Sequence, residues 1–174
     1  MANPNNAPEN EFWIFSLRLY SQPGVAAKCL ALQESCSLDV NVLLFCAWLG
    51  WSRRALLSPL EIQEIEAVVA EWHEGVVKPL RSVRQFLKDA GGAQELRGQV
   101  KAIELAAEKM EQDLLFAFAE RNWAAREVAV PEAYAPPNMQ LYVRSRQRSS
   151  SISEAELSAL VAGIAKSLSS ARAV

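Results

Sequence analysis

The amino-acid sequence predicts an all-α fold in a single domain. Apolar residues recur every three or four positions along most of the chain, which is the spacing of one face of a helix. No segment rich in Val, Ile and Thr alternates for more than a few residues, so strands are not expected. A chain of 174 residues that is 51% hydrophobic can bury one sizeable core. We therefore predict a bundle of about six helices around a central apolar helix.

Two short helices are expected before the central one. The first, residues 11–20, carries two adjoining rows of aromatic and aliphatic side chains and should dock firmly on the core. The second opens at Pro23-Gly24 and ends at a break near residues 35–38. Both are short enough to need tertiary packing for their stability.

The third helix, residues 40–51, is predicted to be the axis of the core. It is apolar on nearly all sides, and Asn41 is its one conspicuous polar residue. Asp39 is the expected N-cap, because an aspartate side chain can accept a hydrogen bond from the free N–H groups of the first turn.

The fourth helix begins with a strong local signal and should then kink. Ser58-Pro59-Leu60-Glu61 combines an N-cap, a proline in the first turn and a capping box. The helical pattern continues from Leu60 to Ala90, but Pro79 lies inside it and lacks the N–H donor required there. We expect a kink or a division near Val77, and an end at Gly91-Gly92.

A long fifth helix is predicted at residues 93–122. Six apolar side chains share one face of it at 100° per residue, and we expect this face to meet the core. They are Leu96, Val100, Ile103, Ala107, Met110 and Leu114.

The sequence divides into three parts on composition. Residues 1–123 should form the helical bundle core, and residues 124–152, rich in Pro, Arg and Ser, are predicted to be a loop or mobile linker. Residues 153–170 should form a C-terminal amphipathic helix that packs on the bundle or on a partner, since Ser153 to Glu156 is a second capping box.

Charge and composition disfavour several classes of partner. The net charge of −2 removes the general electrostatic argument for nucleic acid or an anionic membrane surface. The longest uncharged stretch, residues 40–52, is shorter than the roughly 20 residues of a spanning helix. The first residues have neither a basic start nor an apolar segment, so we expect a cytoplasmic protein. The three cysteines lack a Cys-x-x-Cys spacing and predict neither a disulfide nor a zinc site.

No catalytic, metal or cofactor motif stands out. His73 is the only histidine, and no nucleophile elbow, phosphate loop, dinucleotide fingerprint or His-Glu-x-x-His accompanies it. A carboxylate-bridged two-metal bundle would need Glu-x-x-His on two helices, whereas Glu71 stands two residues before His73. We therefore predict no catalytic residues, no metal and no cofactor.

A basic stripe follows Pro79 and has two interpretations. Its residues lie within an arc of about 120° on a helical wheel. They can form ion pairs with Glu104, Glu108 and Glu111 of the fifth helix, or two arginines can stay free to hold a phosphate, a carboxylate or an acidic partner. The stripe consists of Lys78, Arg81, Arg84 and Lys88.

Trp72 is the tryptophan whose neighbourhood is polar enough to suggest a pocket wall or an interface anchor. Burial in the core is the alternative for Trp72, as it is for the other tryptophans.

Several segments match a known family pattern. They are Phe12-Trp13-Ile14-Phe15-Ser16-Leu17-Arg18-Leu19-Tyr20, Pro23-Gly24-Val25, Cys29-Leu30-Ala31-Leu32-Gln33, Asp39-Val40-Asn41-Val42-Leu43-Leu44-Phe45-Cys46-Ala47-Trp48-Leu49 and Pro79-Leu80-Arg81 with Arg84. In these segments the chain resembles the proteobacterial domain-of-unknown-function family 2390, over roughly residues 11–115. The resemblance implies a small, bacterial, cytoplasmic helical protein and brings no activity. It marks Ser16, Tyr20, Gln33, Asp39, Asn41, Arg81 and Arg84 as the polar positions of the pattern.

Three function hypotheses follow. The leading one is a non-enzymatic interaction or regulatory module that offers its stripe to another protein. The alternative is a small-molecule binder or unrecognised enzyme, with a pocket lined by Trp13, Trp48 or Trp72 and an anion held by Arg81 or Arg84. An RNA-associated protein using Arg144, Arg146 and Arg148 ranks third. The candidate ligand- or partner-binding residues are Lys78, Arg81, Arg84, Lys88, Trp72, Asp39 and Asn41.

Overall fold

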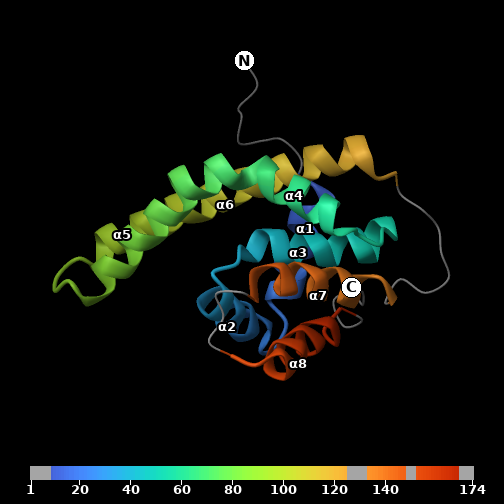
Figure 1. Ribbon diagram of the computed structural model, residues 1–174. Helices are drawn as coiled ribbons and strands as arrows, with labels where there is room; N and C mark the ends of the chain where they lie inside the picture. The colour runs from blue at the N-terminus through green and yellow to red at the C-terminus, as the bar shows by residue number, and fades with distance from the viewer. Residues whose placement is uncertain (1–8, 125–132, 148–151, 169–174) are drawn as a thin grey trace, which may run out of the picture.

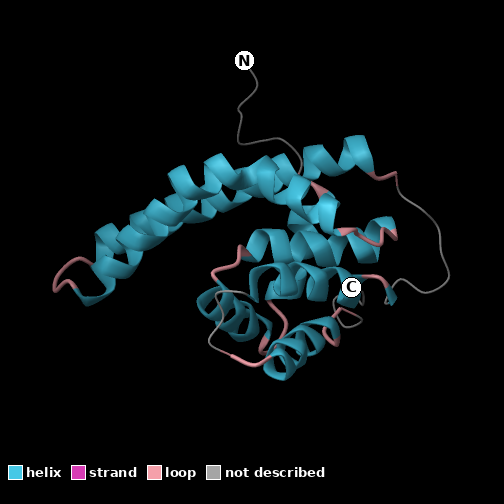
Figure 2. Cartoon of the chain, in the orientation of Figure 1, coloured by secondary structure: helices cyan, strands magenta, loops and turns pink. Residues whose placement is uncertain are grey.

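The computed structural model describes residues 9–124, 133–147 and 152–168, and these contain helices and no strand (Figure 2). The predicted all-α fold is confirmed. With α4 to α5 counted as one continuous helix, the described residues form seven helices, close to the predicted six. None of the described helices combines the length and the apolar character that crossing a bilayer requires.

The first helices follow the expected boundaries. α1 spans Glu11–Tyr20 and α2 spans Val25–Cys36, which leaves a break before the central helix. α3 spans Val40–Trp48 and continues into the π-helix η2, Leu49–Arg53. Asp39 caps α3 as predicted, since its side chain accepts a hydrogen bond from the backbone N–H of Asn41.

α3 is the axis of the core. Figure 1 shows it between the layer that contains α4 and α6 and the layer that contains α7. Trp48 is almost fully buried and packs its ring against Phe12, Phe45 and Phe116, which come from three different helices. The structure therefore confirms that this apolar segment lies at the centre of the bundle (Figure 1).

The fourth helix is divided where proline predicts it. α4 spans Pro59–Trp72, the π-helix η3 spans His73–Val77, and α5 spans Lys78–Asp89. Pro79 lies in the first turn of α5, where its missing N–H leaves no unpaired donor. Within η3 the chain widens, and the N–H of Lys78 donates to the carbonyl of His73 five residues earlier.

α6 spans Gln94–Asn122, as expected, but the face predicted to meet the core is wrong. Leu96, Ile103 and Met110 have exposed fractions of 51%, 55% and 49%. The residues that face inward include Glu104 and Glu111, because α5, η3 and α3 offer polar side chains to α6 in this region. The buried face of α6 therefore combines these polar residues with Ala107, which belongs to the predicted face, and with Leu115 and Ala119.

The predicted loop at residues 124–152 contains a helix, and that part of the prediction is wrong. α7 spans Ala135–Arg146 and buries Asn138, Met139, Tyr142 and Val143. Pro136 and Pro137, two of the prolines that argued against a helix, occupy its first turn, where proline is tolerated. Residues 125–132 and 148–151 of the predicted linker lie outside the described residues.

Asn138 shows why α7 belongs to the bundle. It is fully buried, and its side-chain oxygen accepts from the N–H of Leu57 at 2.9 Å. Its amide nitrogen donates to the carbonyls of Ala55 at 2.8 Å and Cys46 at 3.3 Å. These bonds pair backbone groups of Ala55 and Leu57, between η2 and α4, and add a second donor to the Cys46 carbonyl of α3.

α8 completes the core. It spans Glu154–Ala165, begins at the predicted capping box on Ser153, and packs against α2 and α7. Leu157, Val161 and Ile164 are buried in the same apolar cluster as α3. The core therefore extends beyond residue 123 and includes α7 and α8.

Candidate functional site

A cavity of about 480 Å³ lies among α1, α2, α3, α5 and α6. Its inner wall includes Ser16, Asn41 and Gln112, which are 3%, 6% and 3% exposed. Leu30 and Leu105 also line it and are 44% and 51% exposed, so they stand at its mouth. The buried part of the lining thus combines polar side chains with Trp13 and Leu44, and the rim carries Glu34, Gln85 and Lys101 beside its apolar residues. Apolar walls with a few polar groups are usual in small-molecule sites.

Two polar atoms at the base have no hydrogen-bond partner among the described residues. They are the hydroxyl oxygen of Ser16 and the side-chain oxygen of Gln112, and both are buried. The amide nitrogen of Gln112 is engaged, because it donates to the side-chain oxygen of Asn41 at 2.8 Å. A buried unpaired polar group is costly, so a small side-chain rotation that exposes these two oxygens to the cavity would allow them to bond to a ligand or to water.

The wall of the cavity carries charges of both signs in equal number. Three cationic side chains face three carboxylates, so the lining has no net charge at neutral pH. They are Arg81, Arg84 and Lys101, against Glu34, Glu104 and Glu108.

Arg81 is held by three partners. Its Nη2 donates to Glu108 at 2.8 Å, its Nε donates to Glu104 at 3.3 Å, and its Nη1 donates to Gln33 at 2.9 Å. Arg84 also donates to Glu104, which raises the pKa of the Arg84 guanidinium. Of the two interpretations of the basic stripe, ion pairing across α5 and α6 is confirmed. The prediction that these arginines stay free is wrong, because buried carboxylates of α6 occupy their donors.

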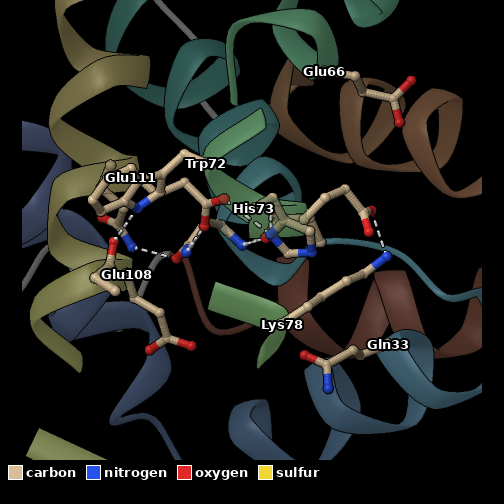
Figure 3. Close-up of polar contacts among 12 residues, drawn as sticks. Gln33, Glu66, Trp72, His73, Lys78, Glu108 and Glu111 are labelled. Atoms are coloured by element: carbon tan, nitrogen blue, oxygen red, sulfur yellow. Dashed lines mark hydrogen bonds and ion pairs between the residues drawn. The ribbon is translucent and has the colours of Figure 1, made fainter. Parts of the chain in front are cut away.

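Of the other predicted site residues, Asn41 lines the cavity, whereas Lys78, Lys88, Trp72 and Asp39 are not among the lining residues. Lys78 forms an exposed ion pair with Glu74, and Lys88 is exposed near the end of α5. Trp72 donates its indole N–H to the carbonyl of Ala107 at 2.9 Å (Figure 3). It therefore ties α4 to α6 and is not among the residues that line the cavity.

A buried polar cluster lies behind the base of the cavity and comprises Asp39, Asn41, His73, Glu111 and Gln112 (Figure 3). His73 Nδ1 is 2.9 Å from Glu111 Oε1 and 3.0 Å from Asp39 Oδ2. The amide nitrogen of Asn41 donates to Glu111 Oε2 at 2.6 Å. Because Asn41 also accepts from Gln112, this cluster positions two side chains that line the cavity.

Burial and the neighbouring polar groups have opposite effects on the pKa values of His73 and Glu111. Burial lowers the pKa of His73, but contacts with the carboxylates of Asp39 and Glu111 raise it to about 9. Burial raises the pKa of Glu111, and hydrogen bonds from His73 and Asn41 oppose that change.

Arg144 and Arg146, the described arginines of residues 144–148, form ion pairs with other helices of the bundle. Arg144 pairs with Glu154 of α8 at 3.0 Å, and Arg146 pairs with Glu66 of α4. Arg148 lies outside the described residues. The pairing of Arg144 and Arg146 with carboxylates gives no support to an RNA-binding role.

Comparison with known proteins identifies the family. A family model described as "Protein of unknown function (DUF2390)" matches residues 11–115. The chain belongs to the DUF2390 family. No curated protein and no solved structure matches the chain.

The DUF2390 region contains both features of interest. Every residue that lines the cavity lies between Trp13 and Gln112, inside the matched range. The buried polar cluster lies inside it as well, whereas α7 and α8 lie beyond it. The matched residues thus hold the candidate site, and the two final helices complete the core beneath it.

Proposed function

We propose that this DUF2390 protein binds a small organic molecule in the cavity among α1, α2, α3, α5 and α6. The observation that carries the proposal is the cavity itself, with two unpaired buried oxygens at its base. Its volume of about 480 Å³ lies within the usual range for ligand pockets. The cavity favours the small-molecule hypothesis over the protein-interaction hypothesis that leads from the sequence.

The lining indicates the chemistry of the ligand. The unpaired amide oxygen of Gln112 calls for a hydrogen-bond donor, such as an ammonium or a hydroxyl group, and the Ser16 hydroxyl can either donate or accept. The balanced charges of the wall favour a molecule that carries both signs over a simple anion. The apolar rim at Leu30 and Leu105 suits a hydrocarbon or aromatic part. A small zwitterion with an apolar portion satisfies all three requirements.

A ligand-observed NMR screen tests the proposal. The probes are amino acids and aromatic carboxylates, with neutral aromatic molecules of equal size for comparison. We expect zwitterions with an aromatic or branched side chain to bind, and Leu105→Glu to weaken their binding at least about tenfold by placing a charge at the apolar rim. Leu96→Glu is the matched control, because Leu96 is equally exposed at 51% on the same helix but does not line the cavity. Equal loss in both variants, or no loss in Leu105→Glu, would contradict this use of the cavity.

Protein interaction remains a second proposed function, and an exposed apolar face supports it. Leu96, Ile103 and Met110 are spaced seven residues apart on α6, and Phe86 of α5 is 77% exposed. On helical wheels these residues point away from the side of α5 and α6 that lines the cavity. Apolar residues at heptad spacing suit an apolar helix of another protein.

Phe86→Glu is expected to abolish capture of such a partner from the native cell extract. Because Phe86 is largely exposed, the free energy of unfolding should change by no more than about 0.5 kcal/mol. Cross-linking followed by mass spectrometry compares wild type with the variant, and sedimentation velocity of the purified protein separates a foreign partner from a second copy. Unchanged capture by Phe86→Glu would show that this face is not the interface.

We also propose that the protein works in the cytoplasm. Cys29, Cys36 and Cys46 are buried free thiols, which supports a reducing compartment.

A further inference from the structure

Three metal-ligand atoms converge inside the bundle from separate parts of the chain. Asp39 precedes α3, His73 opens η3, and Glu111 lies in the middle of α6. Their ligand atoms, Asp39 Oδ2, His73 Nδ1 and Glu111 Oε1, all lie within 4.8 Å of one another. No local sequence motif reveals this set, which explains why the sequence predicts no metal.

The spacing of these atoms suits a metal ion. His73 Nδ1 lies 2.9 Å from Glu111 Oε1 and 3.0 Å from Asp39 Oδ2. Adjacent ligands of an octahedral ion with bonds of about 2.1 Å are separated by about 3 Å. Both pairs that include His73 therefore have the separation of adjacent metal ligands, and the two carboxylates lie within 4.8 Å of each other.

The surroundings of the Asp39 carboxylate give a second reason to expect a cation at this place. Its Oδ2 atom is buried and pairs with His73 Nδ1 at 3.0 Å, but the single N–H group at this nitrogen also lies against Glu111 Oε1. Its side chain is only 8% exposed, so water can satisfy little of it. An unsatisfied carboxylate oxygen in this position is costly unless a cation binds to it.

The charge of the cluster also favours a divalent ion. Asp39 and Glu111 are 7% and 0% exposed, and they face a single imidazole ring. A divalent ion bound by the ring and by both carboxylates would balance the two negative charges in this buried place.

The remaining oxygens of both carboxylates are already held in place. Asp39 Oδ1 accepts from the backbone N–H of Asn41 at 2.8 Å, and Glu111 Oε2 accepts from the Asn41 amide nitrogen at 2.6 Å. Asn41 therefore orients both ligands at once, as outer residues do in established metal sites.

We propose that Asp39, His73 and Glu111 bind a divalent first-row transition-metal ion, with its remaining positions open to water or other small ligands. One imidazole and two carboxylates suit manganese, iron or zinc, and they disfavour magnesium, which takes oxygen ligands. The proposal is independent of the ligand proposed for the cavity, although Asn41 contacts both sites.

Titration calorimetry and thermal melting of the full chain test this proposal with Zn²⁺ and Mn²⁺ after treatment with a chelator. We expect one ion per chain, a rise in melting temperature, and much weaker binding of Mg²⁺. Asp39→Asn should reduce the affinity for Zn²⁺ at least about 100-fold. This variant keeps the N-cap of α3, because asparagine caps helices as well as aspartate does, so it is expected to fold.

Glu74→Gln is the matched control. Glu74 follows His73 directly but is exposed and pairs with Lys78, so its loss should leave Zn²⁺ affinity unchanged. The visible spectrum of bound Co²⁺ supplies a second readout, and it should change in His73→Asn and in Glu111→Gln. If wild type fails to bind a stoichiometric ion, or if Asp39→Asn binds Zn²⁺ as tightly as wild type, the proposal is wrong.

Discussion

Replacing Gly50 with alanine is expected to lower the free energy of unfolding by at least about 3 kcal/mol, the upper end of the usual cost of overpacking. Gly50 lies in η2 and is buried where α7 begins. An added Cβ would lie 2.5 Å from the backbone nitrogen of Ala135 and 2.6 Å from its Cα. Because these neighbours are backbone atoms, the clash can be relieved only by moving α7 away from α3.

Gly98→Ala is the control for this prediction. Gly98 lies within α6, and an added Cβ there meets no atom within 4 Å. Alanine should stabilise α6 by about 0.5–1 kcal/mol, because glycine is the poorer helix former. Urea denaturation followed by circular dichroism measures both variants. A Gly50→Ala protein as stable as wild type would show that α7 does not pack against η2.

The second large effect is expected for Arg81→Gln, with a loss of about 3 kcal/mol in the free energy of unfolding. Arg81 is held against Glu104 and Glu108, and its side chain is only 14% exposed. Its removal leaves Glu108 without its cation, because glutamine carries no charge, and leaves Glu104 paired with Arg84 alone. Burial raises the pKa of Glu108, and the hydrogen bond and charge of Arg81 oppose that change, so the loss of Arg81 should raise this pKa further.

A double-mutant cycle with Glu108→Gln distinguishes this mechanism from simple loss of packing. If the ion pair carries the effect, the double variant should lose less than the sum of the two single variants. Lys78→Gln is the control, because its exposed pair with Glu74 contributes no more than about 0.5 kcal/mol. If Arg81→Gln changed the free energy of unfolding as little as Lys78→Gln, Arg81 would be exposed in solution and the buried ion pair would be contradicted.

The sequence predicts the helix boundaries best where the determinants are local. Ser58 and Ser153 form capping boxes, Asp39 caps α3, and η3 divides the fourth helix just before Pro79. Each of these features depends on residues within one or two turns of one another. The pattern of nearby residues is then enough to place the end of a helix.

The rotation of α6 depends on distant residues and could not be predicted in the same way. Its apolar residues at heptad spacing predict the core face, yet Glu104 and Glu111 are the residues that turn inward. Their partners Arg81, His73 and Asn41 lie between 23 and 70 residues earlier in the chain. A helical wheel contains no information about these partners, so it cannot show that polar residues face the interior.

The same reasoning applies to the candidate site. Arg81 and Asn41 are found from the sequence, and both line the cavity. Glu111 and Gln112 are missed as site residues, because their role arises only when α6 packs beside α3. His73 is noticed as the only histidine, but its carboxylate partners lie 34 and 38 residues away, one on each side in the sequence.

The most direct test of the proposed function is a ¹H–¹⁵N NMR titration of the tryptophan indole groups with the tightest-binding zwitterion of the screen. Trp13 lines the cavity, whereas Trp123 packs against Phe118 and is not among the lining residues. We expect the Trp13 indole resonance to shift in a saturable manner while the Trp123 resonance stays in place. Binding that leaves Trp13 unchanged, or a screen in which no zwitterion binds, would contradict the assignment of this cavity as a ligand site.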